Sequence, residues 1–166
     1  MPRLSPRPAL AATGLAAAAA LGVAFAAEWW GGLVPCPLCL VERWPYRVAI
    51  AVAVLGLLLP RRAARWVLAL VLLVGLAEVA AAGVHVGVEL HAWPSPLPEC
   101  NAPHFSGGSI AERLRSMPAR PSKSCEDGVF PIQGLPLSFA DLNLIYALAF
   151  CAGTIVLLSA TRRRDA

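Results

Sequence analysis

The chain has 166 residues, of which 58% are hydrophobic and only 14% are charged, and its mean hydropathy is +0.65. Soluble domains carry about 25% charged residues, so this composition excludes an ordinary water-soluble globular protein. Folded in water, the chain would expose too much apolar surface, whereas a lipid bilayer would accept that surface. The length allows one domain, and we expect a single membrane domain over residues 1–166.

Four apolar stretches predict membrane-spanning helices. They cover approximately residues 9–27, 45–59, 66–88 and 142–160. A helix needs about 20 residues to cross the bilayer, and backbone groups in lipid must be paired within the protein, so the spans are predicted to be helical. The second stretch is short unless Arg43 and Arg47 lie at the interface with their charged ends in water. The expected fold class is an all-α membrane protein with a four-transmembrane-helix bundle.

The first stretch has an alternative interpretation as a cleaved signal peptide. Arg3 and Arg7 would form its basic region, and the small residues before Glu28 could hold the cleavage site. However, the apolar run is longer than the usual core of about 7–15 residues, and cleavage would leave three spans. We therefore expect an uncleaved first span.

Clusters of arginine predict the topology. They are Arg3 and Arg7 before the first span, Arg61, Arg62 and Arg65 between the second and the third, and Arg162, Arg163 and Arg164 after the fourth. With four spans these clusters share one side, which the positive-inside rule assigns to the cytoplasm. Both termini are expected there, and two loops, residues 28–44 and 89–141, are expected on the opposite side.

Four of the five cysteines fall in these two non-cytoplasmic loops. Cys36 and Cys39 form a CPLC motif in the first loop, and Cys100 and Cys125 lie in the second. An even number of cysteines in an oxidising compartment indicates two disulfides, although four cysteines allow three pairings. Cys151, inside the fourth span, is expected to be a small apolar packing residue.

A zinc site and a purely structural role are the alternatives for these cysteines. Structural zinc sites usually build both halves from closely spaced cysteines, whereas 24 residues separate Cys100 from Cys125. Closing a loop of that size contributes about 3 kcal/mol in the chain-entropy model, which suits this pair taken alone. A bridge between Cys36 and Cys39 constrains almost nothing, so their spacing favours redox chemistry, and no metal is expected.

Arg43 lies four residues after Cys39, so the two side chains share one face if this segment is helical. A guanidinium there stabilises a thiolate, and a helix that begins near Pro37 favours a thiolate at either cysteine. Pro45 allows two geometries, a helix start at Pro45 or a helix that continues with a kink. The alternative for Arg43 is an interfacial anchor, which is the role that we expect for Arg47.

The second loop contains signals for local structure. Its proline-rich residues 93–98 are expected to be extended and to lead to the first cysteine of the loop. Ser109 and Glu112 have the spacing of a capping box, so a short helix is predicted to begin at Ile110. The apolar residues of this helix share one face: Ile110, Leu114 and Met117. We expect an amphipathic helix on the bilayer, or alternatively a solvated loop helix.

Four spans, the sequence PCPLCLVER and a second loop with two spaced cysteines together resemble the disulfide bond formation protein B (DsbB) family over nearly the whole chain. Members of that family reoxidise a periplasmic dithiol oxidase of thioredoxin fold and pass the electrons to membrane quinone. The resemblance implies an enzyme of the bacterial inner membrane with periplasmic cysteine loops. It also implies a DsbA-type partner, ubiquinone or menaquinone as electron acceptor, and no nucleic-acid partner.

The family pattern implies a role for each cysteine. Cys100 resembles the cysteine that the partner's thiolate attacks, and Cys125 would then be released to attack Cys36. Cys39 would be the thiolate that faces the quinone, and Arg43 resembles the arginine that assists there. Quinone reduction would then regenerate the first pair as a disulfide.

Two ionisable residues of the third span are further candidates. His85, near the non-cytoplasmic end, is a candidate to bind the quinone and donate protons to it. Glu78 lies within lipid, where acidic groups are costly and often functional. Either residue could instead only hydrogen-bond a neighbouring helix. His91 and His104 are expected to be solvated loop residues.

Three other functions fit the same sequence. The chain could be a paralogue that serves another dithiol partner, a quinone-linked reductase of the vitamin K epoxide type, or a membrane scaffold with structural disulfides. The vitamin K epoxide type also combines four helices with a CxxC motif, but there we would expect the motif late in the chain. The expected function is therefore a quinone-dependent thiol-disulfide oxidoreductase.

Overall fold

The structure is a computed structural model that describes residues 6–100, 109–115, 123–131 and 134–162. Within these ranges the chain is all-helical, as predicted, with five α-helices, one 3-10 turn and no strands. The elements are α1 (Pro6–Trp29), α2 (Pro37–Leu58), α3 (Arg61–Glu89), the 3-10 turn η1 (Pro98–Cys100), α4 (Ile110–Arg115) and α5 (Phe139–Arg162).

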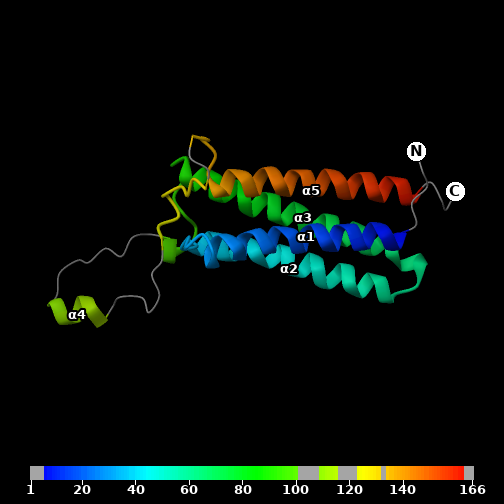
Figure 1. The fold of residues 1–166 in the computed structure, drawn as a ribbon, viewed down its shortest axis with the longest axis horizontal. Helices are drawn as coiled ribbons and strands as arrows, with labels where there is room; N and C mark the ends of the chain where they lie inside the picture. The colour runs from blue at the N-terminus through cyan, green and yellow to red at the C-terminus, as the bar shows by residue number, and fades with distance from the viewer. Residues whose placement is uncertain (1–5, 101–108, 116–122, 132–133, 163–166) are drawn as a thin grey trace.

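Four long helices lie side by side, and Figure 1 shows them running along one common axis. Helix α2 packs against both α1 and α3, α3 packs against α5, and α1 makes smaller contacts with α3 and α5. The turn between α2 and α3 lies at the same end as the start of α1 and the end of α5. Turn η1 lies at the opposite end, and α4 lies apart from the four long helices.

Three of the long helices are long and apolar enough to cross a membrane, namely α1, α3 and residues 139–161 of α5. Helix α2, which was expected to supply another span, does not reach the same apolarity in the described part of the chain, because Glu42, Arg43 and Arg47 lie in its first half. Large apolar side chains are exposed on all four helices, for example Leu15, Leu55, Leu73 and Val156. Such outward faces suit contact with lipid rather than with water.

Small residues let the long helices approach closely. Ala17 and Ala49 are buried at the contact between α1 and α2, in a core cluster that also contains Val71. Gly75 of α3 faces α5, where an added Cβ would lie 2.9 Å from the Sγ atom of Cys151. Cys151 is buried and unpaired, as expected for a small apolar packing residue.

Helix α2 begins directly after Cys36 and continues through Pro45 to Leu58. Pro37 occupies the first helical turn, where its missing N–H group costs no hydrogen bond. Cys36 is the N-cap residue, and its Sγ atom accepts a hydrogen bond from the Cys39 backbone N–H at 3.2 Å. Of the two geometries that Pro45 allowed, the structure therefore has the continuous helix.

Capping boxes start the two later α-helices. At α4, Glu112 N–H donates to Ser109 Oγ at 3.3 Å and Ser109 N–H donates to Glu112 Oε2 at 3.4 Å, which confirms the predicted helix start. At α5, Ser138 and Asp141 form the same reciprocal pair at 2.9 and 3.1 Å. The predicted apolar face of α4 involves the Leu114 side chain and Met117, which lie outside the described residues.

The proline-rich segment after α3 is bent rather than extended throughout. His91 has a φ of 55°, and the chain then folds back so that the Trp93 indole N–H donates to Val84 O at 3.1 Å. The Trp93 ring lies against Gly87, where an added Cβ would clash with the ring. The segment ends in η1, which brings Cys100 back to the end of the long helices.

Candidate functional site

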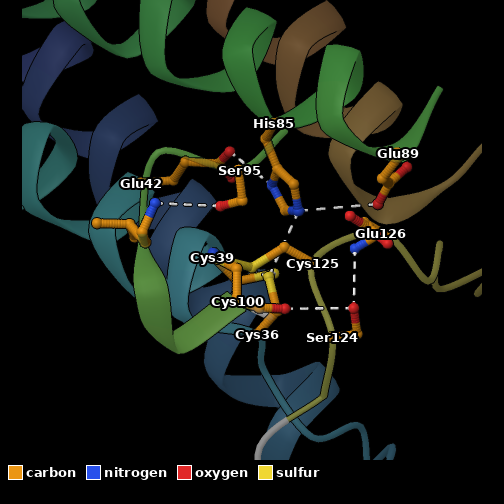
Figure 2. Close-up of a disulfide and its surroundings, with 11 residues drawn as sticks. Cys36, Cys39, Glu42, His85, Glu89, Ser95, Cys100, Ser124, Cys125 and Glu126 are labelled. Atoms are coloured by element: carbon orange, nitrogen blue, oxygen red, sulfur yellow. Dashed lines mark hydrogen bonds and ion pairs between the residues drawn. A yellow bond between two sulfur atoms is a disulfide. The ribbon is translucent and has the colours of Figure 1, made fainter. Parts of the chain in front are cut away.

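Both cysteine pairs gather in one cluster at the end of the long helices (Figure 2). Cys36, Cys100 and Cys125 are buried in this cluster with Leu38 and Val88, and Cys39 and Leu97 pack against it. Cys100 and Cys125 form a disulfide, whereas Cys36 and Cys39 are free thiols with their Sγ atoms 2.8 Å apart. The four predicted redox cysteines are therefore neighbours, with the loop pair oxidised and the CPLC pair reduced.

The loop disulfide is tied down by its own backbone. Cys125 N–H donates to Cys100 O at 3.4 Å, and Ser124 Oγ donates to the same carbonyl at 3.3 Å. Each of the two cysteines is only 1% exposed. The disulfide is therefore shielded from solvent in this structure.

Cys36 has the environment of a thiolate. Its Sγ atom faces the Cys39 thiol at 2.8 Å, the Cys39 backbone N–H at 3.2 Å and His85 Nε2 at 3.4 Å. The hydrogen bonds from the Cys39 thiol and backbone hold the pKa of Cys36 below its ordinary value, although burial opposes this effect. In the reduced pair, the protein environment thus favours a thiolate at Cys36.

Arg43 is a buried residue and not an exposed anchor. Its Nη1 atom lies 2.8 Å from Glu28 Oε2 of α1, and its guanidinium carbon lies 4.9 Å from the centre of the Phe25 ring. The Nε atom of Arg43 has no hydrogen-bond partner in the described part of the chain. Arg47, by contrast, is exposed beside Trp44, which fits its expected role as an interfacial anchor.

An apolar cavity of about 360 Å³ lies beside this site, between α1, the segment before α2, the first half of α2 and α5. Its size falls within the range of about 300–1,000 Å³ that is usual for ligand pockets. Cys39 and Arg43 both line it, so the predicted shared face of these two residues points into one cavity. Glu42, Tyr46 and Asn143 supply further polar groups to an otherwise mainly apolar wall.

His85 does not line this cavity and lies instead behind the cysteines. It is 2% exposed, and Figure 2 shows its ring next to the cysteine cluster, with Glu42 and Glu89 on opposite sides of the ring. Its Nδ1 atom lies 2.8 Å from Glu42 Oε1, and its Nε2 atom lies 3.8 Å from Glu89 Oε1. The quinone-binding role predicted for His85 stays a prediction, and among the described residues its closest partners are Glu42 and Cys36.

Glu42 belongs to a buried polar network that the sequence did not reveal. Asn143 Nδ2 of α5 donates to Glu42 Oε2 at 2.9 Å and to Glu78 Oε1 at 2.8 Å. Tyr46 Oη donates to Asn143 Oδ1 at 3.0 Å. Glu78 is 1% exposed, and its Oε2 atom has no partner among the described residues. The network therefore joins α2, α3 and α5 next to the cavity.

The sulfur atoms of Cys36 and Cys39 and a ring nitrogen of His85 lie within 4.8 Å of one another. Structural zinc sites take four ligands, whereas this group offers three. The two sulfur atoms are already in contact, which suits the formation of a disulfide between them. The arrangement is therefore chemically suited to thiol–disulfide exchange beside an apolar ligand cavity.

Comparison with known proteins agrees with this geometry. The sequence model of the family described as Disulfide bond formation protein DsbB matches residues 6–157. A protein of Rickettsia prowazekii (strain Madrid E) that is described as uncharacterized protein RP370 is 28% identical over 138 residues, which cover 82% of this chain and 80% of that protein. No solved structure matches the chain. Since the family match spans nearly the whole chain and includes both cysteine pairs, the chain belongs to the DsbB family of membrane oxidoreductases that form disulfide bonds.

Proposed function

We propose that this protein is a quinone-dependent thiol oxidase that reoxidises a periplasmic DsbA-type dithiol protein. The observation that carries the proposal is the position of Cys39. This residue packs against the cluster that contains the other three redox cysteines, and it also lines the apolar cavity. Electrons that reach the CPLC pair therefore arrive at the wall of a site that can hold a lipid-soluble acceptor.

Electrons enter at the loop disulfide. A thiolate of the partner attacks Cys100, which forms a mixed disulfide between the proteins and releases Cys125 as a thiolate. Cys125 then attacks Cys36 of the oxidised CPLC pair and releases Cys39. The partner's second thiolate resolves the mixed disulfide and leaves as part of an oxidised partner. The released Cys100 attacks Cys125, which restores the loop disulfide and leaves Cys36 and Cys39 reduced.

The last step of this series of exchanges leaves the loop pair oxidised and the CPLC pair reduced. The structure has the same arrangement of one disulfide and two free thiols. Cys36 lies in the same buried cluster as Cys125, as a direct exchange between the loops requires. Because Cys100 is 1% exposed, partner binding has to make this disulfide accessible before the first exchange.

The cavity residues fit a quinone. A bound quinone supplies an acceptor for two electrons and two protons. The cavity wall is mainly apolar, as a ring with a prenyl tail requires, and Arg43 Nε is a buried donor without a partner among the described residues. We assign to Arg43 the binding of a quinone oxygen. Glu28 and Phe25 hold its guanidinium in place.

The energetics of the partner explain the need for an acceptor. A DsbA-type oxidase has a reduction potential of about −120 mV, whereas structural disulfides lie below about −300 mV. For two electrons this difference corresponds to about 8 kcal/mol uphill. A static disulfide therefore cannot reoxidise such a partner, and draining the electrons into membrane quinone removes this obstacle.

We place the protein in the bacterial inner membrane with four spans, formed by α1, α2, α3 and α5. Both termini and the α2–α3 turn, with the exposed Arg61 and Arg62, are assigned to the cytoplasm. The cysteine cluster, at the other end of the helices, is assigned to the periplasmic side. Helix α2 would cross with Arg47 at the interface and with its apolar second half in lipid.

A quinol-formation assay tests the proposal. Purified protein is mixed with a reduced thioredoxin-fold dithiol partner and quinone, and the loss of quinone absorbance is followed. We expect Cys36→Ser and Cys100→Ser to abolish turnover and Cys151→Ser, which lies outside the cluster, to retain it. Turnover that persists in either of the first two variants would contradict the relay. Circular dichroism confirms that each variant keeps its fold.

A further inference from the structure

A line of buried polar groups leads from Cys36 to the cavity wall. Cys36 Sγ lies 3.4 Å from His85 Nε2, and His85 Nδ1 lies 2.8 Å from Glu42 Oε1. Cys36, His85 and Glu42 are 4%, 2% and 6% exposed, and only Glu42 of the three lines the cavity. The three residues come from the α2 N-cap, α3 and α2, so the packing of two helices creates the line.

We propose that His85 removes the proton from the Cys36 thiol and that Glu42 carries this proton to the cavity. The inference rests on the proposed function, in which the CPLC pair reduces a quinone. It assigns to His85 the role of general base for Cys36 and to Glu42 that of proton carrier, and neither role is the direct binding of the acceptor.

The chemistry of reoxidation creates the need for this route. Two S–H bonds break and one S–S bond forms, while two electrons and two protons pass to the quinone. Cys39 lines the cavity, so its proton has a direct path. Cys36 is not among the residues that line the cavity and is nearly inaccessible to solvent, so its proton needs a path through the protein.

His85 is placed to accept and to release a proton without turning its ring. With the proton on Nδ1 donated to Glu42, the Nε2 atom is free to accept from Cys36. The acidic groups that face the ring are Glu42 from α2 and Glu89 from α3, and both stabilise a positive imidazolium. A thiol, an imidazole and a carboxylate in sequence form the arrangement that activates nucleophilic cysteines in many enzymes.

Asn143 positions the carrier. It donates to Glu42 Oε2, while Glu42 Oε1 faces His85, so the two carboxylate oxygens have different partners. Tyr46 in turn holds the Asn143 side chain through its Oδ1 atom. The second acid bound by Asn143, Glu78, makes no hydrogen bond or ion pair with His85 in the described part of the chain and lies off the route, which makes it a matched control.

The first test needs neither quinone nor partner. The ultraviolet absorbance of the thiolate is recorded against pH in the reduced full-length protein, and the Cys36 contribution is obtained by difference from Cys36→Ser. We expect His85→Gln to move the ionisation of Cys36 upward by about one pH unit, which is roughly a tenfold loss of thiolate in the midrange. Glu42→Gln is tested by turnover instead, because the negative charge of Glu42 itself raises the pKa of Cys36 and its removal would oppose the effect of a weakened histidine base. Glu78→Gln should leave the curve unchanged, as should His91→Gln, because His91 is an exposed histidine outside the line.

Turnover supplies the second readout. Glu42→Gln should lower kcat by at least about tenfold with an unchanged KM for quinone, because a carrier acts after binding. Glu42→Asp, which keeps the carboxylate, should recover part of kcat. A raised KM with an unchanged kcat would instead make Glu42 a binding residue and overturn the proposal.

Two results of the titration would also overturn it. One is an unchanged Cys36 curve in His85→Gln, and the other is an equal shift in Glu78→Gln, which would indicate a general disturbance of the network. If His85→Gln does not fold, the turnover of the near-isosteric Glu42→Gln decides. Because the titration omits quinone and partner, its failure leaves the quinol-formation result for the cysteine variants standing, and the reverse also holds.

Discussion

At the scale of single residues, the two cysteines of the CPLC motif have different surroundings. Cys36 caps α2 and receives hydrogen bonds from Cys39, whereas Cys39 packs against the cluster and lines the cavity. The spacing of the motif predicts that both thiols share a helix start, but it does not say which thiol becomes the acceptor of hydrogen bonds. That distinction comes from the N-cap position, which fixes where the backbone N–H groups point.

The ionisation of Cys36 predicts a pH-dependent stability of the reduced protein. Its folded-state pKa lies below the unfolded value of about 8.5. This thiolate therefore stabilises the fold above that value and stops doing so as the pH falls through the folded-state pKa. We expect the Tm of the reduced protein to rise relative to that of Cys36→Ser as the pH is raised from about 6 to about 9. A Tm difference that is constant or falls with pH would contradict this expectation.

The geometry of Arg43 predicts that lysine cannot replace it. A lysine keeps the positive charge but loses the planar group that contacts both Glu28 and Phe25, and it has no counterpart of Nε. We expect Arg43→Lys to raise the KM for quinone about tenfold or more, since a hydrogen bond to a charged group is worth about 1.5–3 kcal/mol. Arg47→Lys is the control and should leave KM unchanged. Equal KM values in the two variants would contradict the proposed binding of quinone by Arg43.

At the scale of elements, the signals that the sequence carries are local ones. The capping box at Ser109 predicted the start of α4. The same spacing occurs at Ser138 and Asp141, where α5 begins. The pairing of Asn143 with Glu42 joins residues 101 positions apart. A single sequence does not say which helix faces meet, so such pairs could not be predicted.

The close contact between α3 and α5 predicts a rescue by a second substitution. Gly75→Ala would place a Cβ 2.9 Å from Cys151 Sγ and 3.1 Å from a Phe150 ring carbon. We expect a loss of about 1–3 kcal/mol in the free energy of unfolding. Adding Cys151→Ala should restore part of it, as measured by thermal unfolding in detergent. Gly83→Ala is the control, because an added Cβ there meets nothing within 4 Å. If the changes in unfolding free energy of the two single variants simply add in the double variant, the contact between positions 75 and 151 is contradicted.

At the scale of the whole molecule, the sequence predicted the all-helical class and the gathering of four cysteines at one end, and the structure agrees with both. Composition decides the first, since apolar stretches of this length form helices in lipid. The gathering of the cysteines follows from the number of spans, because two spans lie between the two cysteine-bearing loops and so place both loops on the same side. The second apolar stretch was predicted over residues 45–59, whereas α2 begins at Pro37 and does not qualify as a span by length and composition, because its first half includes Glu42, Arg43 and Arg47.

The topology predicts opposite labelling at the two ends of the helices. In a cysteine-free background, Trp30→Cys lies at the proposed periplasmic end, where Trp30 is 88% exposed. It should react with a membrane-impermeant maleimide in cells whose outer membrane has been permeabilised. Arg62→Cys, at the α2–α3 turn, should react only after the inner membrane is broken. The reverse pattern would invert the proposed orientation.

The burial of the loop disulfide has a consequence for which thiols the protein can oxidise. Cys100 and Cys125 are each 1% exposed, so a small free thiol has no path to their sulfur atoms. In the proposed relay, a protein that docks and makes this disulfide accessible starts the exchange. In the proposed function, electrons therefore enter the membrane quinone from a docked dithiol protein and not from small thiols dissolved in the periplasm.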